Sequence, residues 1–234
     1  MKVSRGFSIR VQYFLDEWVP PRIRDSRLLM GLPMKLVMKD SADDFMNFKN
    51  WVWEKDDKEF GNLYKRTLSA QELQGETDLN DKCLKEILAN VKGKKVLDVG
   101  CGRGLLANKL AKNNTVTGCD IVISKSLKDR YPKVSFKQGN IEKLPFKDGS
   151  FDVVITTHTL EHVRNLNLAY KEIKRVAKDK IIIVVPRQRP YKYTFSLHTQ
   201  FFPYNWSLLN SFGFIKGKTT IKNLGDWYYS LELN

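Results

Sequence analysis

Cysteine and histidine are scarce in this sequence. The chain of 234 residues has three of each. The cysteines, Cys83, Cys101 and Cys119, form no C-x-x-C pair and leave an odd one over, so their spacing suits neither a zinc site nor a disulfide set. We expect them to be small, buried, hydrophobic side chains in a reducing compartment.

Long hydrophobic runs are also missing. The longest, Ile181–Val185, is far too short to span a bilayer. The start of the chain has basic residues but no continuous apolar core, so we expect no cleavable signal there. From these two absences we expect a cytoplasmic location, either free or peripheral at the inner face of the membrane.

Acidic residues are outnumbered by basic ones. There are 26 Asp and Glu against 40 Lys and Arg, which gives a formal net charge of +14. This balance favours anionic partners, which include nucleic acid, an anionic membrane surface and acidic substrates. A lysine-rich solvated surface that binds no partner would give the same net charge. The length and the 42% hydrophobic content fit one α/β domain with an extension.

Residues 95–104, Lys-Val-Leu-Asp-Val-Gly-Cys-Gly-Arg-Gly, are the stretch around which the chain is organised. The pattern predicts a buried strand, a glycine turn and then a helix. Glycine lets a ligand approach the main chain, and a helix N-terminus supplies unpaired N–H groups. A dinucleotide fingerprint would need its third glycine at Leu105. Because Asp98 would also lie beside a pyrophosphate, the stretch favours a ligand that carries an ammonium group.

Val-Leu-Asp-Val-Gly-Cys-Gly-Arg-Gly resembles motif I of the class I S-adenosylmethionine-dependent methyltransferases. The resemblance implies that the loop of Gly100, Cys101, Gly102 and Gly104 wraps the methionine part of the cofactor, S-adenosylmethionine, and that Asp98 faces its amino group. It also implies an α/β fold: a Rossmann-like, seven-stranded, mostly parallel sheet with an antiparallel last strand and helices on both faces.

Further cofactor contacts are expected where other strands end. Asp120 ends the second predicted strand, where an acid can accept hydrogen bonds from both ribose hydroxyls; the alternative is a helix N-cap. Ile121 follows it. By the resemblance, Asn140 contacts the adenine amino group and Ile141 offers its backbone N–H and an apolar wall to the ring. Thr157 lies at the C-terminal end of the fourth predicted strand, at the same edge of the sheet.

The three histidines are the candidate general bases. A base is needed when the acceptor is a hydroxyl that must lose its proton, and imidazole titrates near neutral pH. His158, at the end of the fourth strand, is the first candidate. His198 could reach the same site from the loop after the fifth strand, whereas His162 could instead cap or pack the following helix.

Residues 1–75 are predicted to form a helical extension or lid, with residues 76–234 as the methyltransferase domain. In the extension, the apolar stretch from Leu28 to Met38 is broken by Gly31-Leu32-Pro33 and flanked by Arg and Lys. It suits either a membrane interface or a helical pair packed on the domain. In the domain we expect a first helix over 79–90, capped by Thr77 or Asp78, and closing strands at 213–217 and 226–233.

The preferred interpretation is an enzyme that methylates a hydroxyl or amine of a small-molecule, glycan or lipid-linked acceptor. In the extension, the segment Leu-Asp-Glu-Trp-Val-Pro-Pro-Arg-Ile-Arg-Asp-Ser-Arg resembles those of bacterial methyltransferases in surface-polysaccharide or lipid-linked pathways. Two alternatives stay open: an RNA methyltransferase, and a non-catalytic protein that binds S-adenosylmethionine. Against the first, amino-methylating nucleic-acid enzymes commonly carry Asp/Asn-Pro-Pro-Tyr/Phe where this chain has Thr-His-Thr-Leu.

Overall fold

The computed structural model describes residues 10, 13–56, 58–63, 77–213 and 217–233. The chain divides into two compact units. One, the helical unit, comprises Met1–Asp78 and Gln188–Phe201; the other, the sheet unit, comprises Leu79–Arg187 and Phe202–Asn234. The segment after the fifth strand therefore groups with the N-terminal residues, which a single boundary near residue 76 does not capture.

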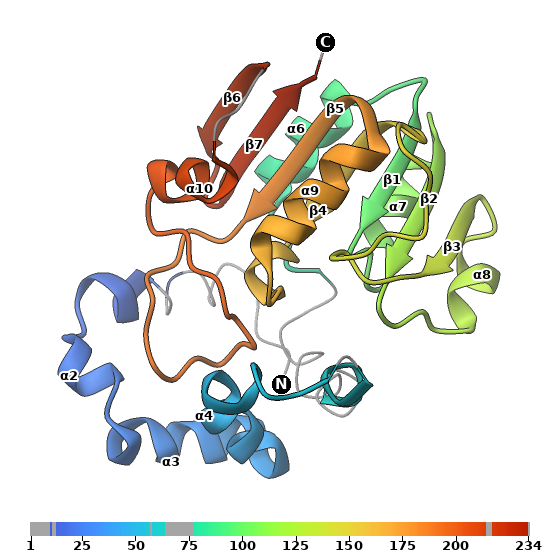
Figure 1. The fold of residues 1–234 in the computed structure, drawn as a ribbon. Helices are drawn as coiled ribbons and strands as arrows, with labels where there is room; N and C mark the ends of the chain where they lie inside the picture. The colour runs from blue at the N-terminus through green and yellow to red at the C-terminus, as the bar shows by residue number, and fades with distance from the viewer. Residues whose placement is uncertain (1–9, 11–12, 57, 64–76, 214–216, 234) are drawn as a thin grey trace. The chain divides into compact units, whose positions relative to one another are not determined.

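The sheet unit is built on one seven-stranded sheet with the order β3-β2-β1-β4-β5-β7-β6 (Figure 1). The first five strands are parallel, and β7 runs antiparallel to both β5 and β6. The strands are β1 (Lys95–Val99), β2 (Thr115–Asp120), β3 (Val134–Gln138), β4 (Phe151–Thr157), β5 (Ala177–Val185), β6 (Lys218–Asn223) and β7 (Trp227–Glu232). This confirms the predicted Rossmann-like fold.

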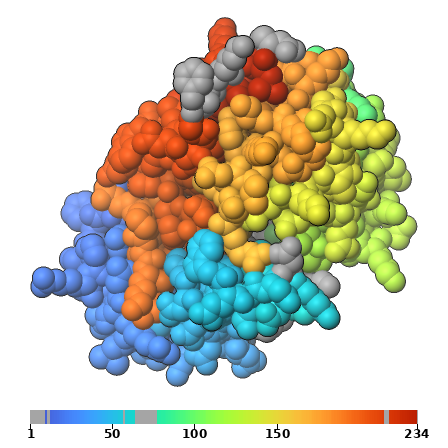
Figure 2. All heavy atoms as spheres, in the orientation of Figure 1, coloured from blue at the N-terminus to red at the C-terminus, as the bar shows by residue number. Residues whose placement is uncertain are grey.

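Helices cover both faces of this sheet. They are α6 (Asp81–Asn90), α7 (Leu105–Leu110), α8 (Ser126–Arg130), the 3-10 turn η2 (Leu160–His162), α9 (Leu166–Val176) and α10 (Asn205–Phe212). One core cluster joins α9 and α10 to one face, and a second joins α6 and α7 to the other. Side chains of α9 and α10 cover the face turned toward the viewer in Figure 2. Both faces are covered, and the central strands accordingly carry continuous apolar runs, Val153–Ile155 in β4 and Ile181–Val185 in β5.

Two boundaries differ from those predicted. Helix α6 is capped by Asn80, whose Oδ1 accepts a hydrogen bond from the backbone N–H of Cys83 at 3.0 Å, and not by Thr77 or Asp78. The first closing strand is β6 at Lys218–Asn223, not 213–217. The β-branched run of Thr219, Thr220 and Ile221 suits a strand better, and Gly213 ends α10 with φ of 67°.

The helical unit contains α2 (Pro21–Arg24), α3 (Arg27–Met38), the 3-10 turn η1 (Lys39–Ser41) and α4 (Ala42–Trp51). These helices belong to the predicted N-terminal extension, of which residues 1–9, 11–12, 57 and 64–75 lie outside the described part. The expected break at 31–33 is wrong, because α3 continues through Pro33. Met30, Met34 and Met38 form one buried stripe along α3, and α3 packs on α4. This packing stabilises the helix although Pro33 has no backbone N–H to donate.

None of the helices in the described ranges is both long and apolar enough to cross a membrane.

Candidate functional site

The glycine loop after β1 is fixed to the end of β2 by its backbone. Gly100, Gly102 and Gly104 have φ values of 73°, 49° and 74°, the left-handed region that other residues rarely adopt. The N–H groups of Gly100 and Cys101 both donate to the carbonyl of Cys119, at 2.7 and 3.1 Å. The loop is therefore held as a rigid cradle before any ligand arrives.

Thr159 packs directly against this loop. A Cβ at Gly100 would lie 2.6 Å from Cγ2 and 2.8 Å from Cβ of Thr159, and its Oγ1 is closer still. The Thr159 hydroxyl donates to the carbonyl of Thr157 at 3.1 Å, which ties it to the end of β4. Sequence reasoning places Thr159 at the edge that faces the site but assigns it no role, since only the folded chain brings it to the glycine loop.

Asp98 is a buried carboxyl group that lacks a full set of partners. Its Oδ2 makes no hydrogen bond within the part of the chain that the structure describes. Burial raises its pKa to about 7, the charge of Asp120 adds to the rise, and a hydrogen bond from the backbone of Ala107 opposes it. A buried, unsatisfied carboxyl oxygen is costly, and a cationic group placed beside the loop would satisfy it.

Asp120 lies at the end of the adjacent strand and binds the same loop. Its Oδ2 accepts from the backbone N–H of Gly102 at 2.8 Å, and its Oδ1 accepts from that of Val122 at 3.1 Å. Burial raises the pKa of Asp120, whereas the hydrogen bonds from Gly102, Val122 and Ile121 lower it. Each carboxylate oxygen keeps a second lone pair, so two acceptor positions stay open for ribose hydroxyls.

The remaining predicted cofactor residues follow the ends of neighbouring strands. Asn140 comes two positions after β3, and its Oδ1 accepts from the backbone N–H of Glu142 at 2.9 Å. The side chain of Ile141 is buried in the core. Thr157 is the last residue of β4. Because β3, β2, β1 and β4 are parallel neighbours, these positions share the carboxyl edge of the sheet, where ligands of open α/β folds bind.

All three cysteines are buried free thiols, as predicted. Burial is the main cause that raises the pKa of Cys83 to about 11 and that of Cys119 to about 12. Burial also raises the pKa of Cys101, and the nearby carboxylates of Asp98 and Asp120 add to the rise. These thiols stay protonated at neutral pH and behave as small packing groups.

His158 is held between two buried carboxylates. Its Nδ1 lies 3.2 Å from Oε1 of Glu161, and its Nε2 lies 3.3 Å from Oδ2 of Asp226. Burial by itself lowers its pKa, but the two acids outweigh burial and raise the pKa to about 10. Both ring nitrogens thus face carboxylates, which favour the charged ring and argue against the predicted role of His158 as general base.

The ion cluster of His158, Glu161 and Asp226 connects three parts of the sheet unit. His158 follows β4, Glu161 lies in η2, and Asp226 lies in the turn between β6 and β7. Oδ2 of Asp226 also accepts from Nδ2 of Asn80, the N-cap of α6, at 2.7 Å. His158 has φ of 50°, which is unusual for a residue with a side chain. The cluster thus fixes the loop that carries Thr159. Sequence reasoning assigns no role to Glu161 or Asp226.

The other two histidines lie in different units. His162 belongs to η2 of the sheet unit, close enough that a positive charge on its ring would lower the pKa of Asp120. His198 belongs to the helical unit, where its Nδ1 lies 2.6 Å from Oε1 of Gln188. Their predicted roles as bases stay predictions.

Known proteins with similar sequences and structures are consistent with a cofactor site at this edge of the sheet. Residues 97–185, which run from β1 through β5, match the family model described as "Methyltransferase domain". The strand order 3-2-1-4-5-7-6 and this match together support a class I methyltransferase fold for the sheet unit. S-adenosylmethionine is the cofactor of that class, and the cradle of three left-handed glycines between Asp98 and Asp120 fits it.

Three individual proteins illustrate the likeness. An uncharacterized protein of Methanocaldococcus jannaschii is 41% identical over 99 residues, which cover 41% of this chain and 42% of that protein. A ubiquinone biosynthesis O-methyltransferase of Azorhizobium caulinodans is 32% identical over 105 residues, 42% of each chain. The chain thus spans less than half the length of these relatives.

The third is a solved structure. The 1,6-didemethyltoxoflavin-N1-methyltransferase of Burkholderia thailandensis, with bound 1,6-didemethyltoxoflavin and S-adenosylhomocysteine, is 16% identical over 76% of this chain and 90% of that chain, with a TM-score of 0.57. At this identity the likeness supports the fold. The two named methyltransferases act on oxygen and on nitrogen, so the shared domain does not fix the acceptor atom.

Proposed function

We propose that this chain is an S-adenosylmethionine-dependent methyltransferase that acts on a hydroxyl or amine of a small-molecule, glycan or lipid-linked acceptor. The observation that carries the proposal is Asp98, a buried acid with an unsatisfied oxygen beside the glycine cradle. A nucleotide's phosphates would be repelled there, whereas the ammonium group of a methionine moiety would pair with it.

The residues of the sheet unit bind and orient the cofactor. Asp98 pairs with the ammonium group, the amide-rich loop of Gly100 to Gly104 encloses the methionine chain, and Asp120 accepts from the ribose hydroxyls. Asn140 and Ile141 face the adenine ring. The cofactor supplies a methyl group already activated on a sulfonium, so the protein needs chiefly to position the two reactants and to exclude water.

The acceptor side relies on fewer residues. With His158 charged and engaged, His162 is the histidine of the sheet unit that we propose as base for a hydroxyl acceptor. A hydroxyl must lose its proton as the methyl group arrives, whereas a neutral amine can lose it afterwards. The O-methyltransferase among the relatives supports the hydroxyl.

Binding of S-adenosylmethionine is expected to depend on pH through Asp98. Its pKa is about 7 without ligand, and the ammonium group selects the ionised form. Affinity should therefore rise roughly eightfold from about pH 6 to about pH 7.5, with release of a proton. Calorimetric titration in buffers of different ionisation enthalpy measures both quantities.

Asp98→Asn should bind more weakly and lose this pH dependence. Asp152→Asn is the matched control, because Asp152 accepts from the backbone of Lys95 at the opposite end of β1, at 2.8 Å. An affinity that does not change with pH in the unaltered protein would contradict the placement of the ammonium group at Asp98.

The function itself is tested by transfer of a labelled methyl group. The full chain is incubated with labelled S-adenosylmethionine and with separate pools of small molecules, glycans, lipids and RNA. We expect label in one of the first three pools and its loss with Asp98→Asn. Label confined to RNA would overturn the proposed acceptor, and binding without transfer to any pool would indicate a non-catalytic protein.

A further inference from the structure

Helix α3 carries apolar side chains on two opposite faces. Met30, Met34 and Met38 are buried in the helical unit. Leu28, Leu32 and Leu36 repeat at the same four-residue spacing on the other face, and they are 86, 66 and 71% exposed. A helix at the surface of a globular unit normally has one apolar stripe and one polar face. The second stripe of leucines needs another explanation.

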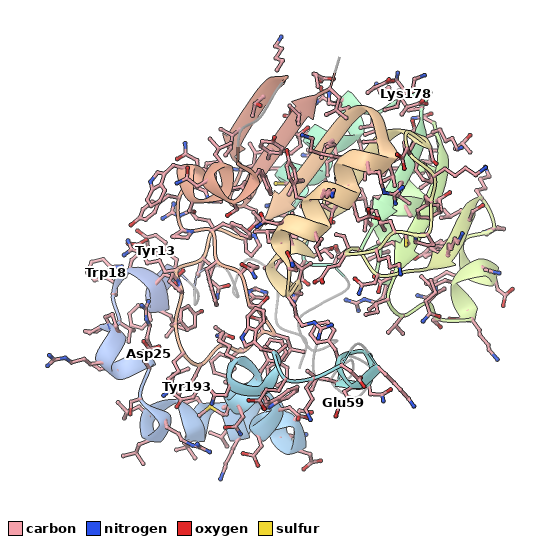
Figure 3. All side chains as sticks on the ribbon, in the orientation of Figure 1. Tyr13, Trp18, Asp25, Glu59, Lys178 and Tyr193 are labelled. Carbon is pink, nitrogen blue, oxygen red and sulfur yellow. The ribbon has the colours of Figure 1, made fainter. Side chains whose placement is uncertain are left out.

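The exposed stripe belongs to a stretch of chain rich in exposed large hydrophobic residues, which together we call the outer apolar surface. Its members are large hydrophobic residues that precede or belong to α2 and α3 and are exposed: Trp18, Ile23, Leu28, Leu29, Leu32, Leu36 and Val37. Trp18 is 72% exposed and is labelled in Figure 3. Single exposed hydrophobic residues are ordinary, but several grouped on one short segment mark an interaction site.

The charges on this segment are of one sign. Arg27, Lys35 and Lys39 are exposed, and the sequence has no acidic residue from Ser26 to Lys39. Arg22 is a fourth exposed cation, on α2. The part of the outer apolar surface that lies on α3 is therefore set among cations without intervening acids.

The acids that precede α3 are engaged within the helical unit. Oδ1 of Asp25 accepts from the backbone N–H of Lys192 at 2.6 Å. Asp16 and Arg24 are largely buried and lie 3.9 Å apart, and Glu17 pairs with Arg189 at 3.0 Å. These acids do not offset the cations of α3, so the exposed segment presents apolar and basic groups together.

We propose that α3 binds the surface of an anionic lipid membrane, with its leucines in the interface and its cations at the headgroups. The helix is 12 residues long, too short to span but suited to lie in the plane of the interface. Lys and Arg bury their aliphatic stems beside the acyl chains while their charges stay at the phosphates. A protein partner would have to be both apolar and acidic, whereas an anionic bilayer offers these two features by its nature.

The test is sedimentation of the full chain with vesicles of phosphatidylglycerol and phosphatidylcholine, and with phosphatidylcholine alone. We expect binding to the anionic vesicles at low salt and a marked loss at high salt, because exposed charges are screened. Replacing Leu28, Leu32 and Leu36 by Ser should weaken binding about 100-fold. The double variant Arg27→Glu/Lys35→Glu, which keeps the leucines, should weaken it roughly 30-fold.

Leu168→Ser is the matched control, since Leu168 is a 45% exposed leucine on α9 of the sheet unit. It should bind vesicles as the unaltered protein does. Absence of sedimentation at low salt would overturn the proposal, as would equal binding by the triple serine variant. Light scattering without lipid tests a second copy as the occupant: a dimer abolished by the serine substitutions would also overturn it. None of these readouts uses S-adenosylmethionine, so they can fail while methyl transfer succeeds.

Discussion

Replacing Gly100 by Ala is expected to lower the free energy of unfolding by roughly 2–5 kcal/mol. Two costs add here. Gly100 has φ of 73°, where alanine is strained, and the new methyl group would overlap the side chain of Thr159. Because both partners are held by backbone hydrogen bonds, the loop cannot move aside without loosening the cradle. Urea unfolding measures the loss, and affinity for S-adenosylmethionine should fall with it.

Two other glycines separate the costs. Gly102 and Gly149 have φ of 49° and 58°, and a Cβ at either would meet no protein atom within 4 Å. Replacing either glycine by alanine should lower the free energy of unfolding by only about 1–2 kcal/mol. Gly102→Ala should also weaken cofactor binding, because its methyl group would stand where the ligand approaches, whereas Gly149→Ala should not. If all three variants lost equal stability, the contact between Gly100 and Thr159 would not matter.

Relief of the overlap offers an independent check. In the Gly100→Ala background, Thr159→Ala removes the two nearest atoms and leaves a Cβ at 2.8 Å. Part of the lost stability should return, whereas Thr159→Ala alone should be mildly destabilising. If the double variant lost the sum of the stabilities that the two single variants lose, Gly100 and Thr159 would not be in contact.

Local sequence signals account for the first half of the site. The strand, glycine turn and helix at 95–110 are contiguous, so their pattern defines both their structure and their ligand contacts. Asp120 was predictable for the same reason, since it ends a strand that pairs with β1. The seven-stranded, mostly parallel sheet was expected from the resemblance to a family and not from periodicity, which carries no information about which strands pair.

The second half of the site depends on distant residues. Asp226 meets His158 only because β7 inserts between β5 and β6, which places the turn before β7 near the end of β4. Nothing in the residues around His158 indicates that meeting, and a histidine at a strand edge is otherwise a reasonable base. The break predicted at Pro33 failed similarly, because packing of three methionines outweighs one lost hydrogen bond.

The largest effect of pH on stability is expected from His158. Its pKa is about 10 in the folded protein against 6.5 when unfolded, so the folded state binds the extra proton between those values. The resulting stabilisation is complete below about pH 6.5 and is lost as pH rises through about 10, by at most about 1.4 kcal/mol per pH unit. Urea unfolding at several pH values within this window measures the slope.

His158→Asn should remove that slope and cost roughly 3–5 kcal/mol at neutral pH, because Glu161 and Asp226 would be left buried without their cation. Asparagine tolerates the φ of 50°, so the loss reports charge and not backbone strain. Adding Asp226→Asn should recover part of it, since one of the two uncompensated acids is then neutral. Nitrogen NMR of the ring gives the direct measurement: both nitrogens should remain protonated near pH 8. A ring that titrates near 6.5 would restore His158 as a candidate base and would show that the three side chains do not form an ion cluster.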